Sequence, residues 1–299
     1  MKNNIILVSI ILSILSLPAF SQKGKSIIAP NTEVEKLADK FSFTEGPAVD
    51  KKGNIYFTDQ PNDKIYKWST KGELSVFNDN TGRANGLYFD RKGNLLACSD
   101  MDNEIWSFSK DGSHSTLITD FEGKKLNGPN DLWIHPNGNI YFTDPLYKRD
   151  YWTRNPEIQQ DGEYVYLLSA DYKSLIKVTD DLVKPNGIIG SPDGKLLYVA
   201  DIGANKTYVY DIKTDGSLTN KRLFTSLGSD GMTIDQQGNI YLTGRGVTVF
   251  NPLGEQIEHI AVDAGWTANV CFGGKDMKTL FITASQYLYA LRMNVKGVK

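Results

Sequence analysis

The sequence predicts an all-β protein, a six-bladed β-propeller with a metal site on its central axis. Three observations support this prediction: a segment that recurs six times, hairpin chemistry inside each copy, and an oxygen-bearing residue at the head of every copy. Propeller blades are four-stranded sheets repeated around an axis, so six copies predict six blades.

The recurring segment has a constant plan. A polar residue comes first, then a short apolar stretch, a turn, and a run rich in strand-forming residues. The copies start roughly 40 to 55 residues apart, a spacing typical of propellers and other repeat arrays. They read EGPAVDKKGNIYFTD from Glu45, NGLYFDRKGNLLACSD from Asn85, NDLWIHPNGNIYFTD from Asn130, NGIIGSPDGKLLYVAD from Asn186, DGMTIDQQGNIYLTG from Asp230 and NVCFGGKDMKTLFITA from Asn269.

The interior of each copy predicts a β-hairpin, because alternating apolar runs flank a turn with glycine. A third strand follows in most copies, as in KIYKW at 64–68 and EIWSF at 104–108. No segment shows sustained helical periodicity, which excludes helical repeats. We expect the stretch from Thr32 to Leu37 to complete the last blade and close the ring. The turn glycines of the first five copies are Gly53, Gly93, Gly138, Gly194 and Gly238, and the sixth copy has Met277 and Lys278 at its turn.

The leading residues of the six copies are all carboxylates or carboxamides: Glu45, Asn85, Asn130, Asn186, Asp230 and Asn269. Equivalent positions in successive blades are related by rotation about the axis, so we expect these side chains to converge at one mouth of the channel. Carboxylate and amide oxygens are the ligands that Ca²⁺ prefers. The alternative is that Asn-Gly and Asp-Gly merely form the loop into each blade. Turn chemistry explains the glycines, but it does not require Glu45, or Asn130 followed by Asp131.

The composition excludes several other classes of function. The formal net charge is -2 with both signs mixed along the chain, and no basic block appears, so nucleic acid is not an expected partner. The three histidines lack the spacing of a zinc site, and no Gly-x-Ser-x-Gly motif indicates a serine hydrolase. The two cysteines, Cys98 and Cys271, lie in apolar stretches, where we expect buried free thiols; a disulfide formed after export is the alternative.

Five of the segments carry a family resemblance: FTEGPAVDKKGNIYFTD, GPNDLWIHPNGNIYFTDPLY, KPNGIIGSPDGKLLYVAD, SDGMTIDQQGNIYLT and CFGGKDMKTLFITA. In this order they resemble the senescence marker protein/gluconolactonase/luciferin-regenerating family, most closely its bacterial gluconolactonase branch. The resemblance implies a lactonase with an axial metal on Glu45, Asn186 and Asp230. It gives Asn130 a role toward metal or substrate. Many sugar lactonases have an arginine where this chain has Gly128.

The expected chemistry is the opening of a small lactone by an activated water at a divalent cation, Ca²⁺ or another such as Mn²⁺, Mg²⁺ or Zn²⁺. Asp230 is the expected base, with a hydroxide carried by the metal as the alternative, and Asn130 assists as a catalytic or substrate-orienting residue. Asn85 and Asn269 are expected to orient the substrate. Arg83 stands two residues before Asn85, the offset of Gly128 from Asn130, and is a candidate substrate cation.

A long connection, 145–163, separates the third and fourth copies and carries Tyr147, Tyr151 and Trp152. Long loops in compact domains are often lids, so Tyr147 and Trp152 are candidates for packing against a sugar ring. The alternative is an ordered surface insertion. Two further functions stay open: hydrolysis of another ester or a phosphotriester at the same metal, and a non-catalytic binding propeller.

The N-terminus predicts export. Lys2 precedes an apolar run from Ile5 to Leu17, and small residues at Ala19 and Ser21 suit cleavage before Gln22. The alternative is a retained membrane anchor, for which the run is short. We therefore predict a signal peptide at 1–21 and one propeller domain at 22–299. The mature protein is expected to be periplasmic or secreted, without a membrane partner, and a monomer or weak oligomer.

The export prediction has a direct measurement. Expressed with its own leader in a Gram-negative host, the protein should accumulate outside the cytoplasm, and N-terminal sequencing should begin at or near Gln22. An intact Met1 in the membrane fraction would establish the anchor instead.

Overall fold

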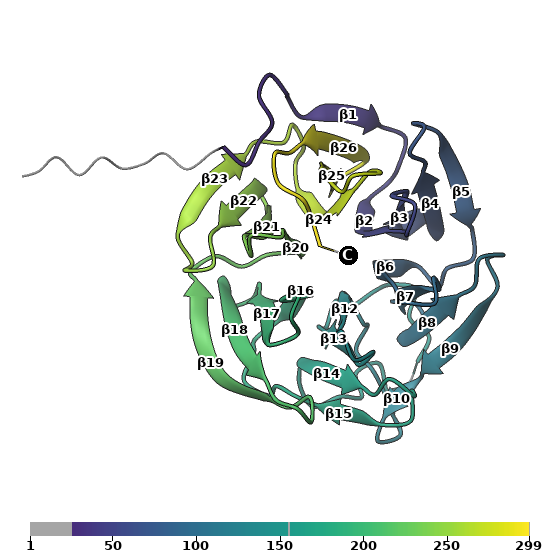
Figure 1. Cartoon of the computed structure of the whole chain (residues 1–299). Helices are drawn as coiled ribbons and strands as arrows, with labels where there is room; N and C mark the ends of the chain where they lie inside the picture. Colours follow the sequence, from purple (N-terminus) through teal and green to yellow (C-terminus); the bar gives the residue numbers. More distant parts are fainter. Residues whose placement is uncertain (1–25, 155, 299) are drawn as a thin grey trace, which may run out of the picture.

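Six four-stranded sheets surround a central axis in the computed structural model, which describes residues 26–154 and 156–298 (Figure 1). Neighbouring strands in every sheet are antiparallel, and each sheet is one blade. The predicted six-bladed β-propeller is thereby confirmed. The predicted signal peptide lies outside the described residues.

Strand order runs from the axis outward in each blade. Blade 1 has β2 (Thr44–Val49), β3 (Ile55–Asp59), β4 (Lys64–Trp68) and β5 (Leu74–Asn78); blade 2 has β6 (Ala84–Phe89), β7 (Leu95–Ser99), β8 (Glu104–Phe108) and β9 (His114–Ile118); blade 3 has β12 (Leu132–Ile134), β13 (Ile140–Asp144), β14 (Tyr164–Leu168) and β15 (Leu175–Lys177). Blade 4 has β16 (Pro185–Gly190), β17 (Leu196–Asp201), β18 (Lys206–Ile212) and β19 (Leu218–Thr225); blade 5 has β20 (Met232–Ile234), β21 (Ile240–Gly244), β22 (Gly246–Phe250) and β23 (Gln256–Ile260). A short 3₁₀ helix, η1 (Gln60–Asn62), follows β3, and a two-stranded hairpin, β10 (Asp120–Phe121) with β11 (Lys124–Lys125), precedes blade 3.

Blade 6 closes the ring with both ends of the chain. It contains β24 (Thr267–Gly273), β25 (Thr279–Ala284) and β26 (Tyr287–Arg292), and its outermost strand is β1 (Glu35–Ala38), antiparallel to β26. This confirms the predicted closure by the N-terminal stretch, although the strand begins three residues later than expected. Ring closure therefore depends on strand pairing and not on the axial side chains.

The repeated turns have a common chemical basis. Asp50 at the end of β2 accepts hydrogen bonds from the backbone N–H of Asn54 at 2.9 Å and from its side chain at 2.7 Å. The same aspartate–asparagine pair recurs at the ends of β6 and β20. Gly53 between the two residues has a φ of 89°, a conformation that favours glycine. In blade 3, His135 takes the place of the aspartate, and its ring also contacts the carbonyl of Gly194 in blade 4 at 2.9 Å.

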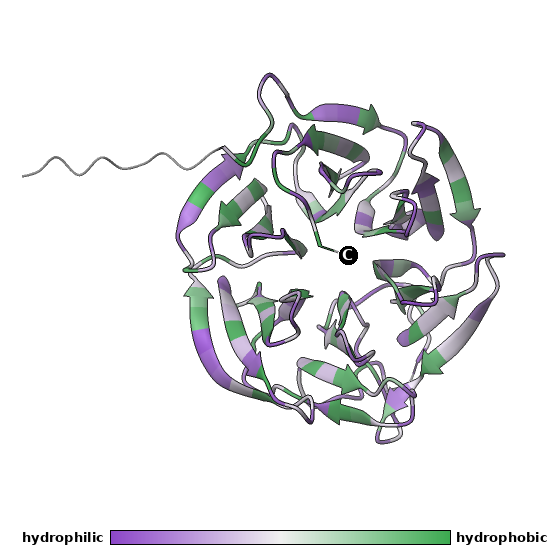
Figure 2. Cartoon of the chain, viewed as in Figure 1, coloured by the Kyte–Doolittle hydropathy of each residue, from purple (hydrophilic) through white to green (hydrophobic). Residues whose placement is uncertain are grey.

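The core lies between blades, so the second strands are buried on both faces. All residues of β3, β7, β13 and β21 are buried. Their sequences, such as Ile55-Tyr56-Phe57, are therefore continuously apolar, as expected of strands covered on both sides. Outer strands such as β1 and β19 carry hydrophilic stretches toward solvent (Figure 2). Cys98 and Cys271 are buried and unpaired, as predicted.

The C-terminal tail after β26 runs back toward the axis (Figure 1). Lys296 accepts a hydrogen bond from Gln236 at 2.8 Å, and Gly297 donates one to Met277 at 2.9 Å. Both partners belong to turns at the far ends of the inner strands β20 and β24. The tail therefore covers the end of the axis opposite the leading residues. No helix in the described ranges is long and apolar enough to cross a membrane.

Candidate active site

The six leading residues lie within two residues of the first residue of each inner strand. The inner strands surround the axis (Figure 1). Five of the leading residues are buried and Asp230 is half-buried. The inner strands approach one another so closely that the residue after each head is constrained. A Cβ on Gly46 would lie 2.2 Å from the carbonyl oxygen of Asn85, and one on Gly231 would lie 2.0 Å from the side chain of Asn269. Packing around the axis thus explains the glycines, but not the oxygen-bearing heads.

Contacts between blades join several heads directly. The Asn186 Nδ2 donates to Asp230 Oδ1 at 2.8 Å, which links blades 4 and 5. The indole N–H of Trp266 donates to the other oxygen of Asp230 at 2.6 Å. Glu45 Oε2 accepts from the N–H of Gly46 at 2.9 Å. These bonds fix the orientation of both carboxylates that the sequence placed at the axis.

A third carboxylate, Asp131, also lies in the site and was not among the predicted site residues. It is buried, and its Oδ2 accepts from Asn269 Nδ2 at 3.4 Å, a link between blades 3 and 6. Asp131 occupies the position that glycine holds in copies one, two, four and five. A Cβ on the equivalent Gly86 would lie 2.7 Å from Asp131. The sequence did carry a signal: among the first five copies, only the third lacks a glycine after its leading residue.

Charge repulsion and burial act together on these carboxyls. Burial raises the pKa of Glu45 well above its usual value, and the negative charges of Asp230 and Asp131 raise it further. Burial also raises the pKa of Asp230, against the hydrogen bonds from Trp266 and Asn186. Burial raises the pKa of Asp131 to about 7. Three acidic groups that share a dry space favour either a bound cation or bound protons.

The amide oxygens complete a donor set that fits a hard divalent cation. The Oδ1 atoms of Asn186 and Asn85 are buried without a hydrogen-bond partner in the described structure. Buried polar atoms normally have partners, so two unpaired oxygens beside carboxylates indicate a ligand that accepts their lone pairs. No three His, Cys, Asp or Glu side chains within the described ranges group closely enough to hold a metal alone. A cation here would therefore need amide as well as carboxylate oxygens, as the sequence predicted.

One residue of the segment 145–163, Tyr147, contacts a candidate ligand. The segment is called the lid below, after the role that the sequence predicts for it, and that role stays a prediction. The Tyr147 hydroxyl accepts from Asn186 Nδ2 at 2.9 Å. Burial and the charge of Asp230 raise the pKa of Tyr147 to about 12, so its hydroxyl keeps its proton. The ring of Trp152 lies beneath the guanidinium of Arg154 at 3.9 Å, and its indole N–H is buried without a partner. Tyr147 thus reaches the candidate ligands, whereas a substrate contact for Trp152 stays a prediction.

The remaining predicted residues have structural contacts that leave their roles open. Asn130 is buried, and its backbone N–H donates to Thr143 at 2.9 Å. Arg83 Nη1 donates to the carbonyl of Pro61 at 2.6 Å, and the guanidinium lies 4.7 Å from the ring centre of Tyr151. Arg83 therefore packs against the lid, and its contact with substrate stays a prediction.

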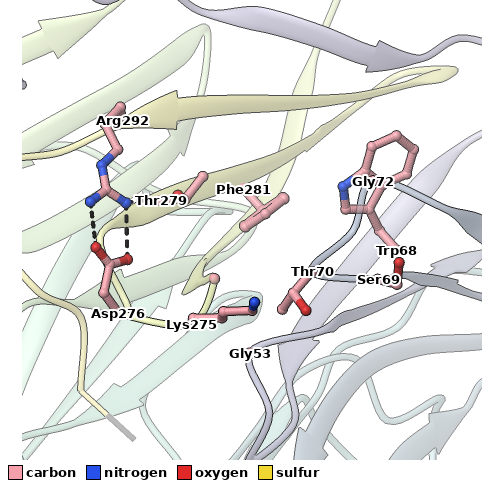
Figure 3. A pocket seen from close by; sticks show the side chains of 11 residues that line it. Gly53, Trp68, Ser69, Thr70, Gly72, Lys275, Asp276, Thr279, Phe281 and Arg292 are labelled. Atoms are coloured by element: carbon pink, nitrogen blue, oxygen red, sulfur yellow. Dashed lines mark hydrogen bonds and ion pairs between the residues drawn. The ribbon is translucent and has the colours of Figure 1, made fainter.

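A separate groove of about 450 Å³ lies between blades 1 and 6, on the side of the inner turns (Figure 3). Its acidic residue, Asp276, is paired with Arg292, which lowers the pKa of Asp276 to about 2. None of the leading residues lines this groove. The groove therefore adds nothing to the axial chemistry.

Comparisons with known proteins agree with this geometry. The family described as SMP-30/Gluconolactonase/LRE-like region matches residues 43–286. A gluconolactonase of Zymomonas mobilis is 29% identical over 93% of this chain and 86% of its own length. The solved structure of a gluconolactonase from Xanthomonas campestris has a TM-score of 0.83 and 29% identity, covering 89% of this chain and 91% of its own. A diisopropyl-fluorophosphatase of Loligo vulgaris is 28% identical over 74% of this chain and 79% of its own length.

The burial of Asp131 predicts a pH dependence for the metal-free protein. Its folded pKa of about 7 lies above the unfolded value of about 3.9. The protonated form therefore stabilises the fold fully below about pH 4, and this stabilisation is lost as the pH rises through about 7. Each pKa unit corresponds to about 1.4 kcal/mol, so Asp131 alone should lower the free energy of unfolding by about 4 kcal/mol across that range. Urea denaturation in chelator measures it.

The variant Asp131→Asn cannot ionise at this position and should remove the contribution of Asp131 to this pH dependence between about pH 4 and 7. The matched control is Asp111→Asn, because Asp111 is exposed and its hydrogen bonds with Ser113 lower its pKa, which places its titration below this range. An Asp131→Asn protein with the wild-type pH dependence would show that Asp131 is ionised throughout.

Proposed function

The chain belongs to the SMP-30/gluconolactonase/LRE-like family, and on this premise we propose that it is a metal-dependent hydrolase that opens a sugar lactone. The similarity to gluconolactonases over nearly the whole chain supports the lactone as substrate class. The observation that supports the metal is the set of three carboxyls, those of Glu45, Asp131 and Asp230, whose pKa values are all raised by burial, together with the unpaired amide oxygens of Asn186 and Asn85.

The residues that would hold the cation are Glu45, Asn186 and Asp230, with Asn130 contacting either metal or substrate. When bound, a divalent cation supplies a Lewis acid for the ester carbonyl and offsets the carboxylate charge. Ca²⁺ suits this all-oxygen set. Trp266 and Tyr147 would orient the ligands, because they hold Asp230 and Asn186 respectively through hydrogen bonds.

The proton transfers are assigned to the chain's own carboxyls. A water gives one proton to Asp230 while its oxygen adds to the lactone carbonyl carbon. The ring C–O bond then breaks, and the leaving oxygen takes the proton back from Asp230 to become the hydroxyl of the product acid, which restores the carboxylate. The raised pKa of Asp230 supports this role, because a base is most effective when its pKa approaches the working pH.

Asp131 is a second candidate for the base. Its pKa of about 7 is close to the working pH, as suits a general base. Asp131 accepts a hydrogen bond from Asn269 and is not one of the predicted metal ligands. The two aspartates differ in their partners: both oxygens of Asp230 accept hydrogen bonds from side chains, whereas Asp131 Oδ1 accepts from the N–H of Leu132.

A second candidate function is hydrolysis of a phosphotriester at the same metal. The similarity to a diisopropyl-fluorophosphatase over three quarters of the chain favours it as the alternative. We also propose that the enzyme acts outside the cytoplasm, on the sequence of its N-terminus.

The proposal predicts a metal requirement that follows the ligands. Chelator should abolish lactone hydrolysis, measured as proton release, and added Ca²⁺ or Mn²⁺ should restore it. Glu45→Gln and Asp230→Asn should each lower kcat/KM at least about 100-fold, since about 2.7 kcal/mol of transition-state stabilisation would be lost. The same assay should also include a phosphotriester. If the protein hydrolyses the phosphotriester faster than the lactone, the second candidate function is favoured.

The matched control is Glu157→Gln, which removes an exposed carboxylate paired only with Lys148 and should leave kcat/KM unchanged. The β-sheet circular dichroism signal should persist in all three variants, because the ring closes through strand pairing. Full lactonase activity in chelator would contradict the metal, and the absence of hydrolysis of any ester with metal present would favour a binding propeller.

A further inference from the structure

The lid carries an arginine that is fixed to a buried carboxylate of another blade. Arg149 Nε donates to Asp100 Oδ2 at 2.8 Å, and the side chain of Asp100 is 5% exposed. The Gln60 amide donates to the same oxygen at 2.7 Å and to the Tyr151 hydroxyl at 3.2 Å. A buried carboxylate without a charged partner destabilises the fold. The pairing with Asp100 therefore holds the guanidinium of Arg149 in one position.

Asp100 differs from the acids at the corresponding ends of other blades. Asp59, Asp144 and Asp201 each accept two backbone N–H groups from the loop that leads into their own blade. In blade 2 the strand ends with Ser99, and the loop is held instead by Asp63 of blade 1. Asp100 therefore makes no such structural contact within the described residues, and its side-chain partners come from blade 1 and the lid.

Gly128 makes room for this arrangement. A Cβ at this position would lie 3.1 Å from Asp100 Oδ1 and 3.7 Å from the ring of Trp152. The space above Gly128 is thus filled by the anchor of Arg149 and by the lid. A longer side chain at 128 would displace both.

The free part of the guanidinium lies near the axial ligands. The guanidinium carbon of Arg149 is 5.6 Å from the ring centre of Tyr147, whose hydroxyl accepts a hydrogen bond from the candidate ligand Asn186. Nε is its only atom that donates to a protein acceptor in the described structure, and the side chain is 28% exposed. Both terminal amino groups are therefore available to a ligand at the mouth.

We propose that Arg149 binds the ring hydroxyls of the lactone and so selects polyhydroxylated lactones over unsubstituted ones. This inference rests on the proposed lactone hydrolysis and deepens it. A guanidinium offers a rigid fork of donors, which suits two neighbouring hydroxyl oxygens. Its charge is already offset by Asp100, so neutral acceptors fit better than a second carboxylate. Arg83 differs in that one of its terminal amino groups, Nη1, already donates to the carbonyl of Pro61, so it cannot offer both terminal groups to a ligand.

The test compares two substrates in the metal-loaded full-length mature protein, an aldono-δ-lactone and δ-valerolactone, which has no hydroxyl. Arg149→Ala should lower kcat/KM for the aldonolactone at least tenfold, about 1.4 kcal/mol, and change that for valerolactone less than about threefold. Asp100→Asn should reproduce the selective loss, because Arg149 loses its anchor, with the melting temperature recorded for each variant. The matched control is Lys148→Ala, which removes the neighbouring exposed cation of the lid and should leave both rates unchanged.

The outcomes separate this inference from the function beneath it. Equal losses on both substrates, or no loss on the aldonolactone, would overturn the role of Arg149 while the wild-type activity still supports lactone hydrolysis. A folded, metal-loaded wild-type protein that hydrolyses neither lactone would overturn the proposed function itself. Retained selectivity in Asp100→Asn together with lost selectivity in Arg149→Ala would confine the inference to Arg149 and reject Asp100 as its positioning residue.

Discussion

The repulsion among Glu45, Asp131 and Asp230 is the constraint on which the site depends. Burial makes ionisation costly for each carboxyl, and their shared position makes it costlier still for Glu45. A propeller can tolerate this because its stability comes from cores between blades and from the closure of β1 on β26. The axial side chains are therefore free to serve chemistry, and a cation would turn their repulsion into binding energy.

Close packing and polarity act at different positions of the same inner strands. The glycines after the heads let neighbouring blades approach, as Gly46 does against Asn85. The heads themselves project oxygens that neighbouring strands cannot fully satisfy, and Asn186 Oδ1 remains unpaired. The segment 145–163 contacts this polar ring through the hydrogen bond between Asn186 and Tyr147. It contacts blade 2 through the ion pair of Arg149 with Asp100.

The repeat allowed the fold and the ring of heads to be predicted, because rotation about an axis converts equal sequence positions into neighbouring side chains. It also predicted the closing strand, since blade 6 had too few strands of its own. Asp131 was missed because it stands where four of the other copies have a glycine, so it looked like an irregularity of the repeat. Asp100 and Arg149 could not be predicted, because their contact joins a strand end to a loop that follows no repeat.

The central claim is that the axial oxygens hold one divalent cation, and diffraction from crystals grown with Mn²⁺ tests it most directly. The account predicts one anomalous-difference peak on the axis, within bonding distance of Glu45, Asn186 and Asp230, at the end opposite the C-terminal tail. An axis without a peak in well-ordered crystals, or a peak bound only by residues outside this set, would contradict it.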